Sequence, residues 1–379
     1  MSVNTTGRRV PLLDLKAQFD PMREEVMAAI TRVVESQGFI MGPDVTALEA
    51  EISAYTGAPF AIGCASGSDA LFLALLAAGV GPGDEVLTTP YTFFATVGAI
   101  VRAGARPVFA DIHPETFNLN PDLVPSLLDA HPAIKAIIPV HLFGACADMD
   151  PIMAQARERG LTVIEDAAQA IGAEYKGRRA GTIGNIACFS FFPSKNLGGF
   201  GDGGILTTVD AGLAEKLRAL RVHGSKKKYY HAWVGVNSRL DSLQAAVLRL
   251  KLPRLDGWTE GRQRNAAYYR ERLPALGVPV TLPAVPDHTS RHIYNQFVIC
   301  GERRDQLQAY LKEQGIGTEV YYPLPMHMQE CFAGLGYKEG DFPVSERLAG
   351  TSLALPVYPE LSHEDIDYVC EQIAAFYRA

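Results

Sequence analysis

A lysine in an unusual setting carries most of the chemical information in this sequence. Lys195 lies within residues 191–199, a run of aromatic residues, proline, serine and glycines. An amine that condenses with a carbonyl needs such a desolvated, rigid setting, which keeps it unprotonated and oriented. Asp166 ends the apolar run 162–166, so a carboxylate is also at hand. Pyridoxal phosphate requires a lysine for its aldehyde and a carboxylate for its ring nitrogen. The pair Asp166 and Lys195 therefore predicts chemistry with this cofactor.

Composition and charge limit the function classes. Of the 379 residues, 47% are hydrophobic and 20% are charged, as in ordinary globular proteins. The net charge of −7 argues against broad nucleic-acid binding. The six cysteines form no CxxC pair and no metal-like pattern with histidine, so we expect reduced thiols, no metal and a cytoplasmic location. The longest apolar stretch, residues 70–80, is too short to span a bilayer, and we expect no membrane partner.

Strand-like and helix-like patterns alternate over residues 60–208. The strand candidates are short apolar runs without alternation, which is typical of parallel strands buried on both faces. Helices between them are expected at 69–78 and 149–159, each followed by a glycine. This βαβ pattern predicts an α/β fold with a mostly parallel central sheet. The candidate strands are residues 60–62, 85–87, 107–110, 136–140, 161–164 and 186–191.

The length favours a large domain followed by a smaller one. Amphipathic patterns predict a helix over 19–36 before the alternating region and a long helix over 240–255 after it. We place the boundary at the end of the long helix, giving a large α/β domain over 1–255. Residues 256–379 would form a smaller C-terminal α+β domain, with helices at 304–314 and 364–377.

Two serines are candidates for binding a phosphate. Residues 63–71 join a strand to a helix through small residues, and backbone amides with the Ser68 hydroxyl suit a phosphate at the helix N-terminus. A plain glycine turn with a serine cap fits the same run. Ser190, five residues before Lys195, is a second phosphate candidate. Phe93 follows the strand at 85–87 and could stack on a flat cofactor, although core packing is the simpler interpretation of Phe93 taken singly.

Two further motifs are ambiguous. Residues 199–204 formally match the dinucleotide fingerprint GxGxxG, but a strand-like run at 205–208 follows where that fingerprint requires a helix. We therefore reject NAD binding and expect the glycines to permit close backbone approach beside Lys195. Residues 226–230 hold three lysines and two tyrosines. They suit a solvated loop or, together with His223 and residues 237–239, a surface facing an anionic substrate.

Taken together, these motifs resemble the DegT/DnrJ class of pyridoxal-phosphate-dependent nucleotide-sugar aminotransferases. The resemblance covers nearly the whole chain and implies fold type I, the fold of aspartate aminotransferase. Family members build each active site across a homodimer. The segments that carry the resemblance are residues 11–15, 38–43, 66–71, 165–169, 190–195 and 237–246.

The resemblance implies a role for each cofactor residue. Lys195 would take the cofactor aldehyde, Asp166 would pair with the ring nitrogen, and Gln169 would meet the 3-hydroxyl side. Phe93 would stack on the ring, and the remaining residues would hold the phosphate, with Asn237 reaching across from the second subunit. The implied cofactor set is Gly67, Ser68, Phe93, Asp166, Gln169, Ser190, Lys195 and Asn237.

The resemblance also implies the reaction. Glutamate would donate its amino group, a nucleotide-linked keto sugar would accept it, and Lys195 would move protons as general acid and base. Such reactions serve amino-sugar and polysaccharide biosynthesis. The sequences of residues 201–204 and 236–241 are most similar to those of enzymes that aminate UDP-linked 3-keto-N-acetylglucuronate. Tyr321 and the residues around His327 differ from that group. The implied substrate contacts are Met41, Tyr229, Arg239, Tyr321 and His327.

Three alternatives follow from the family. A relative with histidine in place of Lys195 dehydrates its sugar, so the lysine argues against that reaction. An aminotransferase that acts at C4, or on a cyclitol ketone, remains an alternative to amination at C3. A non-catalytic regulatory relative is disfavoured because Asp166, Gln169, Ser190 and Lys195 are all present.

Overall fold

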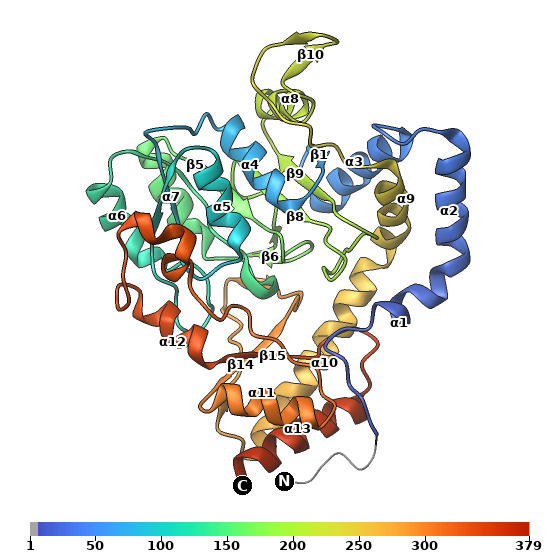
Figure 1. Cartoon of the computed structure of the whole chain (residues 1–379), viewed down its shortest axis with the longest axis vertical. Coiled ribbons are helices and arrows are strands. Elements are labelled where there is room, and N and C mark those ends of the chain that lie inside the picture. Colours follow the sequence, from blue (N-terminus) through green and yellow to red (C-terminus); the bar gives the residue numbers. More distant parts are fainter. Residues whose placement is uncertain (1–6, 379) are drawn as a thin grey trace.

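The structure is a computed structural model, and it describes residues 7–378. A seven-stranded sheet forms the centre of the larger part of the molecule, with strand order β1-β9-β8-β5-β4-β2-β3 (Figure 1). Its strands are β1 (Phe60–Cys64), β2 (Glu85–Thr88), β3 (Arg106–Phe109), β4 (Ile134–Ile137), β5 (Thr162–Asp166), β8 (Ile186–Ser190) and β9 (Gly204–Thr208).

The sheet is mostly parallel, as the apolar runs predict. Strands β8, β5, β4, β2 and β3 run parallel to one another. Strand β9 is antiparallel to both β1 and β8. Each of the six candidate strands corresponds to one of these strands. The run at 205–208 lies in β9, so a strand does follow the glycine-rich segment, which confirms why the dinucleotide fingerprint fails.

Helices cover both faces of this sheet, and successive strand residues point to opposite faces. Ile164 and Leu206 pack in the cluster under α4, α5 and α8, whereas Val163 and Ile205 pack in the cluster that includes α3, α7 and α9. Burial on both faces explains why the strands are continuously apolar. The helices of the larger part are α1 (Leu15–Phe19), α2 (Arg23–Ser36), α3 (Pro43–Thr56), α4 (Gly67–Ala77), α5 (Phe94–Arg102), α6 (Val124–Ala130), α7 (Met149–Arg159), α8 (Ala211–Leu220) and α9 (Ser242–Lys251).

Two predicted helices are interrupted, in both cases at a proline. The helix expected over 19–36 contains a 3-10 turn at Asp20–Met22 that includes Pro21, and α2 starts only after it. The helix expected over 240–255 becomes α9, a 3-10 turn at Leu252–Arg254 that includes Pro253, and then α10 (Leu255–Ala275). Proline has no amide hydrogen for the helix ladder, so each helix restarts beyond it.

The C-terminal part has its own apolar core. Strands β12 (Val280–Thr281), β14 (Phe297–Gly301) and β15 (Ser352–Leu355) form an antiparallel sheet that packs with α10, α11 (Arg304–Glu313) and α13 (His363–Arg378). Val10 also packs in this core, so the N-terminal segment lies against the C-terminal part before the chain enters the large sheet. The division at residue 255 stays a prediction. The remaining strands and α-helix are β6 (Glu174–Tyr175), β7 (Arg178–Arg179), β13 (Thr289–Arg291), β10 (Ser225–Lys227), β11 (Tyr230–His231) and α12 (Pro343–Thr351).

The hairpin of β10 and β11, which contains Tyr229, projects from the end of the molecule opposite the C-terminal part (Figure 1). Within residues 7–378, no helix combines the length and the apolar character that a membrane span requires.

Candidate active site

A cavity of about 310 Å³ opens where the parallel strands end, as expected of a ligand site in an α/β sheet. It lies between the large sheet and residues of the C-terminal part. Eight of the residues predicted from the sequence line it, and they come from segments that are far apart in the chain. These eight are Gly67, Ser68, Phe93, Asp166, Gln169, Ser190, Lys195 and Tyr321.

Lys195 lies in the loop that leaves β8. Its backbone amide donates to the Phe192 carbonyl at 2.9 Å, which closes a turn and holds the side chain in the cavity. Burial lowers the pKa of the Lys195 amine to about 8, and the negative charge of Asp166 opposes this shift. An amine with this pKa is partly unprotonated near neutral pH, so it can act both as a nucleophile and as a base.

Asp166 ends β5 and is buried in the same cavity. The Thr96 hydroxyl donates to Oδ2 at 2.7 Å, and the Ala168 amide donates to Oδ1 at 3.2 Å. Burial raises the pKa of Asp166, while these two donors and the charge of Lys195 favour the carboxylate. The carboxylate is thus held in one orientation, facing a cavity that also contains an amine.

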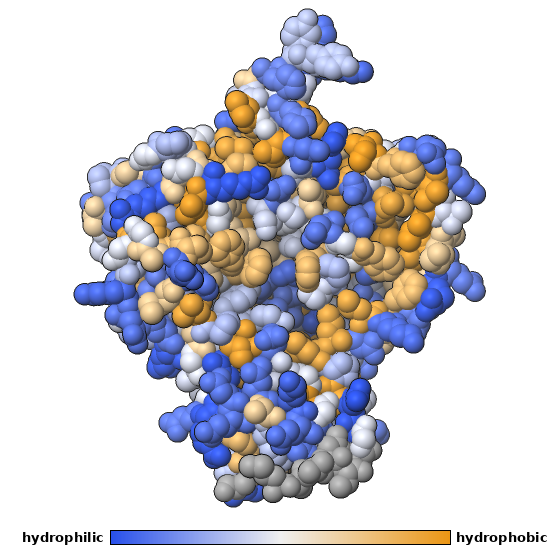
Figure 2. Space-filling view, in the orientation of Figure 1, coloured by the Kyte–Doolittle hydropathy of each residue, from blue (hydrophilic) through white to orange (hydrophobic). Residues whose placement is uncertain are grey.

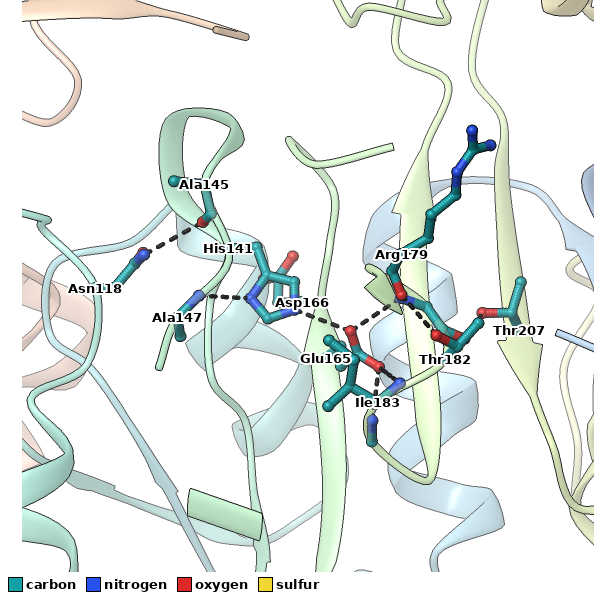
Figure 3. A network of polar contacts seen from close by, with 12 residues as sticks. Asn118, His141, Ala145, Ala147, Glu165, Asp166, Arg179, Thr182, Ile183 and Thr207 are labelled. Carbon is teal, nitrogen blue, oxygen red and sulfur yellow. Dashed lines mark hydrogen bonds and ion pairs between the residues drawn. The ribbon is translucent and has the colours of Figure 1, made fainter. Parts of the chain in front are cut away.

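A buried pair behind Asp166 braces this strand end (Figure 3). The Glu165 carboxylate accepts from His141 Nε2 at 2.9 Å, and both side chains are fully buried. His141 Nδ1 accepts from the Ala147 amide at 3.1 Å, so the ring hydrogen lies on Nε2. Three backbone amides, those of Gly181, Ile183 and Gly184, complete the donors to Glu165. Burial opposes the charge of Glu165, but the His141 and amide donors outweigh it and lower its pKa.

Gln169 is fixed at both ends of its side-chain amide. Its Oε1 accepts from the Phe143 amide at 2.8 Å, and its Nε2 donates to the Tyr322 hydroxyl at 3.0 Å. Burial raises the pKa of Tyr322, so its hydroxyl stays protonated. Phe93 also lines the cavity; the residue is 55% exposed, and its ring centroid lies 5.9 Å from that of Tyr322. An exposed phenylalanine in a cavity suits a flat ligand better than core packing does.

The N-terminus of α4 forms one end of the cavity. Ser66 caps the helix by accepting from the Asp69 amide at 3.1 Å, and Gly67 and Ser68 occupy the first turn, whose amides have no helical partner. A Cβ added at Gly67 would lie 2.7 Å from the Cβ of Ser190, so only glycine fits there. Free amides with two serine hydroxyls suit a phosphate.

The glycine-rich segment beside Lys195 does allow close backbone approach. A Cβ added at Gly204 would lie 2.5 Å from the backbone of Ser66, and one at Gly199 would lie 2.8 Å from the Gln244 side chain. Asp202 and Gly203 themselves line the cavity. The segment therefore brings the loop after Lys195 against the phosphate end of the site.

Five residues predicted from the sequence do not line this cavity. Met41 and Asn237 are exposed, Arg239 is half-buried, and Tyr229 lies on the projecting hairpin. His327 is buried and pairs with Glu346 at 3.0 Å. Their roles toward substrate, or toward a second subunit in the case of Asn237, stay predictions.

Other contributors to the site were missed in the sequence. Thr96, His141 and Tyr322 make hydrogen bonds to Asp166, Glu165 and Gln169, but each lies far from its partner in the chain. One indication of these partners was present in the sequence, the acid Glu165 next to Asp166 at the end of β5. A second carboxylate in a buried strand requires hydrogen-bond donors from elsewhere in the fold.

The sequence profile of the DegT/DnrJ/EryC1/StrS aminotransferase family matches residues 20–374. The chain belongs to this family. The aminotransferase is also similar in structure to S. venezuelae DesV, solved in complex with a ketimine intermediate. That match has a TM-score of 0.94 and 43% identity, and it covers 98% of this chain and 99% of DesV. The expected fold type I and the expected aminotransferase class are confirmed.

Three curated relatives cover nearly the whole aminotransferase. The pleiotropic regulatory protein of Geobacillus stearothermophilus is 55% identical over 97% of this chain and 99% of its own length. The UDP-N-acetyl-3-dehydro-alpha-D-glucosamine 3-aminotransferase of Acidithiobacillus ferrooxidans is 45% identical over 96% of both chains. The UDP-2-acetamido-2-deoxy-3-oxo-D-glucuronate aminotransferase of Pseudomonas aeruginosa is 41% identical over 95% of this chain and 98% of its own.

Pyridoxal phosphate is the cofactor of this family, and the cavity fits it. The α4 N-terminus with Ser68 and Ser190 suits the phosphate, because Gly67 leaves no side chain in the way. Asp166 offers a carboxylate for the ring nitrogen, and Lys195 offers an amine whose pKa is already lowered. The arrangement matches both chemical requirements that the sequence suggested.

Proposed function

We propose that the enzyme transfers the amino group of L-glutamate to the C3 keto group of a UDP-linked 2-acetamido sugar. The observation that carries this proposal is the cavity in which Lys195, with its lowered pKa, lies with Asp166 and the open N-terminus of α4. The names of two relatives, both acting on UDP-linked 3-keto sugars, support the acceptor. The absence of disulfides among the six cysteines supports a cytoplasmic location.

Lys195, Asp166 and Gln169 would each act on a different part of the cofactor. Pyridoxal phosphate, when bound, supplies an aldehyde that accepts nitrogen and a ring that delocalises electrons from the carbon that loses a proton. Lys195 would hold the aldehyde of the cofactor, and its amine, with a lowered pKa, could move a proton between carbon atoms as general acid and base. Asp166 would hold a proton on the ring nitrogen, and the Gln169 amide, fixed by Phe143 and Tyr322, would help to orient the ring.

A homodimer is part of the proposal. Exposed apolar side chains gather on α2 and the segment after it, and Figure 2 shows hydrophobic surface over this side of the molecule. Large exposed apolar patches mark interaction surfaces. These exposed side chains are Met27, Val34, Phe39, Ile40 and Met41. A second subunit on this face would cover them and bring its own Asn237 toward the phosphate end of the site.

A regulatory function is the second candidate, because one relative at 55% identity is named as a regulatory protein. A regulator has no need for an amine with a lowered pKa beside a buried carboxylate, and both are present. We therefore favour catalysis, and the same experiment tests both functions.

The test is a panel of acceptors offered to the purified enzyme with pyridoxal phosphate and L-glutamate. UDP-linked 2-acetamido-3-keto sugars with and without a C6 carboxylate, a 4-keto sugar and a cyclitol ketone would be compared, with products identified by mass spectrometry. We expect a 3-amino product and none from Lys195→Ala. Product from the 4-keto sugar or the cyclitol alone would overturn the acceptor. No product from any acceptor, although the cofactor binds, would favour the regulatory function.

A further inference from the structure

A second cavity, of about 110 Å³, adjoins the candidate active site. Ser194, Gln296 and Tyr321 line both cavities, and Ser194 directly precedes Lys195 in the chain. The far walls of the second cavity come from the N-terminal segment at Leu13 and from the end of β15 at Leu355. A small group bound near Lys195 can therefore extend into a compartment that the cofactor residues do not line.

This compartment contains a buried positive charge. Arg262 of α10 is only 4% exposed, and its Nη1 donates to the carbonyls of Tyr294 at 3.1 Å and Asn295 at 3.4 Å. Burial lowers the pKa of Arg262 to about 10, opposed by the charge of Glu360, so the guanidinium stays cationic at neutral pH. Within the described residues, no carboxylate forms an ion pair with it. A buried guanidinium that contacts only carbonyls is costly unless an anion joins it.

Two side-chain amides at the wall of this compartment keep their oxygens out of it. Asn295 Oδ1 and Gln296 Oε1 are buried and accept no hydrogen bond within the described residues. The Asn295 amide nitrogen donates to Asn196 Oδ1 at 2.8 Å, which sets the orientation of that side chain. Both oxygens are closed off from the compartment, so a ligand bound there would not reach them. The compartment therefore offers a ligand one charged partner, the Arg262 guanidinium, which complements a carboxylate.

We propose that the second cavity binds a carboxylate of the amino donor, with Arg262 as its cationic partner. This assignment rests on the proposed function, which supplies an amino acid as donor. A hexuronate acceptor could offer a carboxylate too, but the compartment is small, is walled by apolar residues and adjoins the site at Ser194. These features favour the smaller substrate.

The test uses the first half-reaction, which needs no sugar. Enzyme loaded with pyridoxal phosphate is mixed with L-glutamate, and the loss of visible absorbance gives the half-saturating concentration. For Arg262→Gln we expect this concentration to rise about ten- to a hundredfold, the loss typical of a charge-assisted hydrogen bond. Arg262→Lys should lose less. The KM for the keto sugar should stay within about twofold, since the acceptor does not use this pair.

Arg304→Gln is the matched control. Arg304 is a buried arginine of the same part of the molecule that donates to the Ser352 carbonyl at 2.8 Å, and it lines neither cavity. If Arg262 only held backbone carbonyls, the two variants would behave alike, and the proposal would fail. A rise in the KM of a hexuronate acceptor alone would assign the carboxylate to the sugar and would equally overturn it.

Two further arms keep the test decisive. L-Glutamine lacks the side-chain carboxylate and isoglutamine lacks the α-carboxylate, so the two analogues show which carboxylate Arg262 binds. In the wild-type enzyme, the analogue that lacks this carboxylate should need a higher half-saturating concentration than glutamate. In Arg262→Gln that difference should disappear. If that variant does not fold, Gln296→Glu places a competing carboxylate near an intact Arg262 and should also raise the half-saturating glutamate concentration. An unchanged value in Gln296→Glu would count against the site. Failure of the keto-sugar assay leaves this half-reaction measurable, so the two proposals fail separately.

Discussion

The charge of Asp166 depends on hydrogen-bond donors that oppose the effect of its burial. Burial raises its pKa, and the hydroxyl of Thr96 and the amide of Ala168 act against that shift. In the role that we propose for Asp166, only the ionised form can hold a proton on the ring nitrogen of the cofactor, so we expect activity only above the pKa of this carboxyl. The Thr96 hydroxyl should then set part of the acid limit of activity.

Thr96→Val should move that limit upward. Loss of a hydrogen bond to a charged group, worth about 1.5–3 kcal/mol, disfavours the carboxylate and raises the pKa of Asp166 by about one to two units. The acid limb of the kcat/KM profile should shift to higher pH by the same amount. Thr92→Val is the control, because Thr92 bonds to Thr96 at 2.8 Å and leaves the Thr96–Asp166 bond in place. An unshifted acid limb in Thr96→Val would show that another group sets it.

At the scale of elements, the phosphate end depends on the fit between α4 and β8. Gly67→Ala would place a methyl group 2.7 Å from the Cβ and 3.2 Å from the Cα of Ser190. Overpacking of this kind costs about 1–3 kcal/mol, and the shift would displace the first-turn amides. The Kd for pyridoxal phosphate, from absorbance titration, should rise about fivefold to a hundredfold.

The matched control for Gly67→Ala is Gly257→Ala. Gly257 lies inside α10 with nothing within 4 Å of an added Cβ, so this change should stabilise the protein by about 0.5–1 kcal/mol and leave cofactor affinity unchanged. Equal cofactor affinity in both variants would argue against a phosphate at α4.

The elements themselves were largely predictable, and the failures have local causes. The central strands were found because burial on both faces makes them continuously apolar, as at Val163 and Ile164. Helix breaks at Pro21 and Pro253 were missed because the apolar periodicity continues across them. The three-stranded sheet of β13, β6 and β7 was missed too, since strands of two or three residues are too short to show a period.

The cofactor end of the site was predictable from family motifs, whereas Met41 and Arg239, which also lie in such motifs, do not line the cavity. Lys195, Asp166 and Gln169 lie in such motifs and in the cavity. Thr96, His141 and Arg262 were not predictable, because their importance comes from partners that only the tertiary structure brings near. The predicted role of Asn237 cannot be read from a single chain, since its predicted partner belongs to a second subunit.

At the scale of the whole molecule, a dimer with shared sites can be tested by mixing inactive subunits. Lys195→Ala and Asn237→Ala should each abolish or nearly abolish activity. In a hybrid dimer, one site combines Lys195 of one subunit with Asn237 of the other, and both are intact there. Random exchange makes about half the dimers hybrid, each with one working site of two, so about a quarter of wild-type activity should return.

The control mixes Lys195→Ala with Asp166→Ala. These two side chains line the same cavity of a single chain, so no hybrid of this pair contains an intact site, and no activity should return. Subunit exchange would be verified in both mixtures with differently tagged chains. If exchange is complete and the first mixture stays as inactive as the second, Asn237 does not serve the partner's site. The exposed apolar face on α2 would then need another occupant.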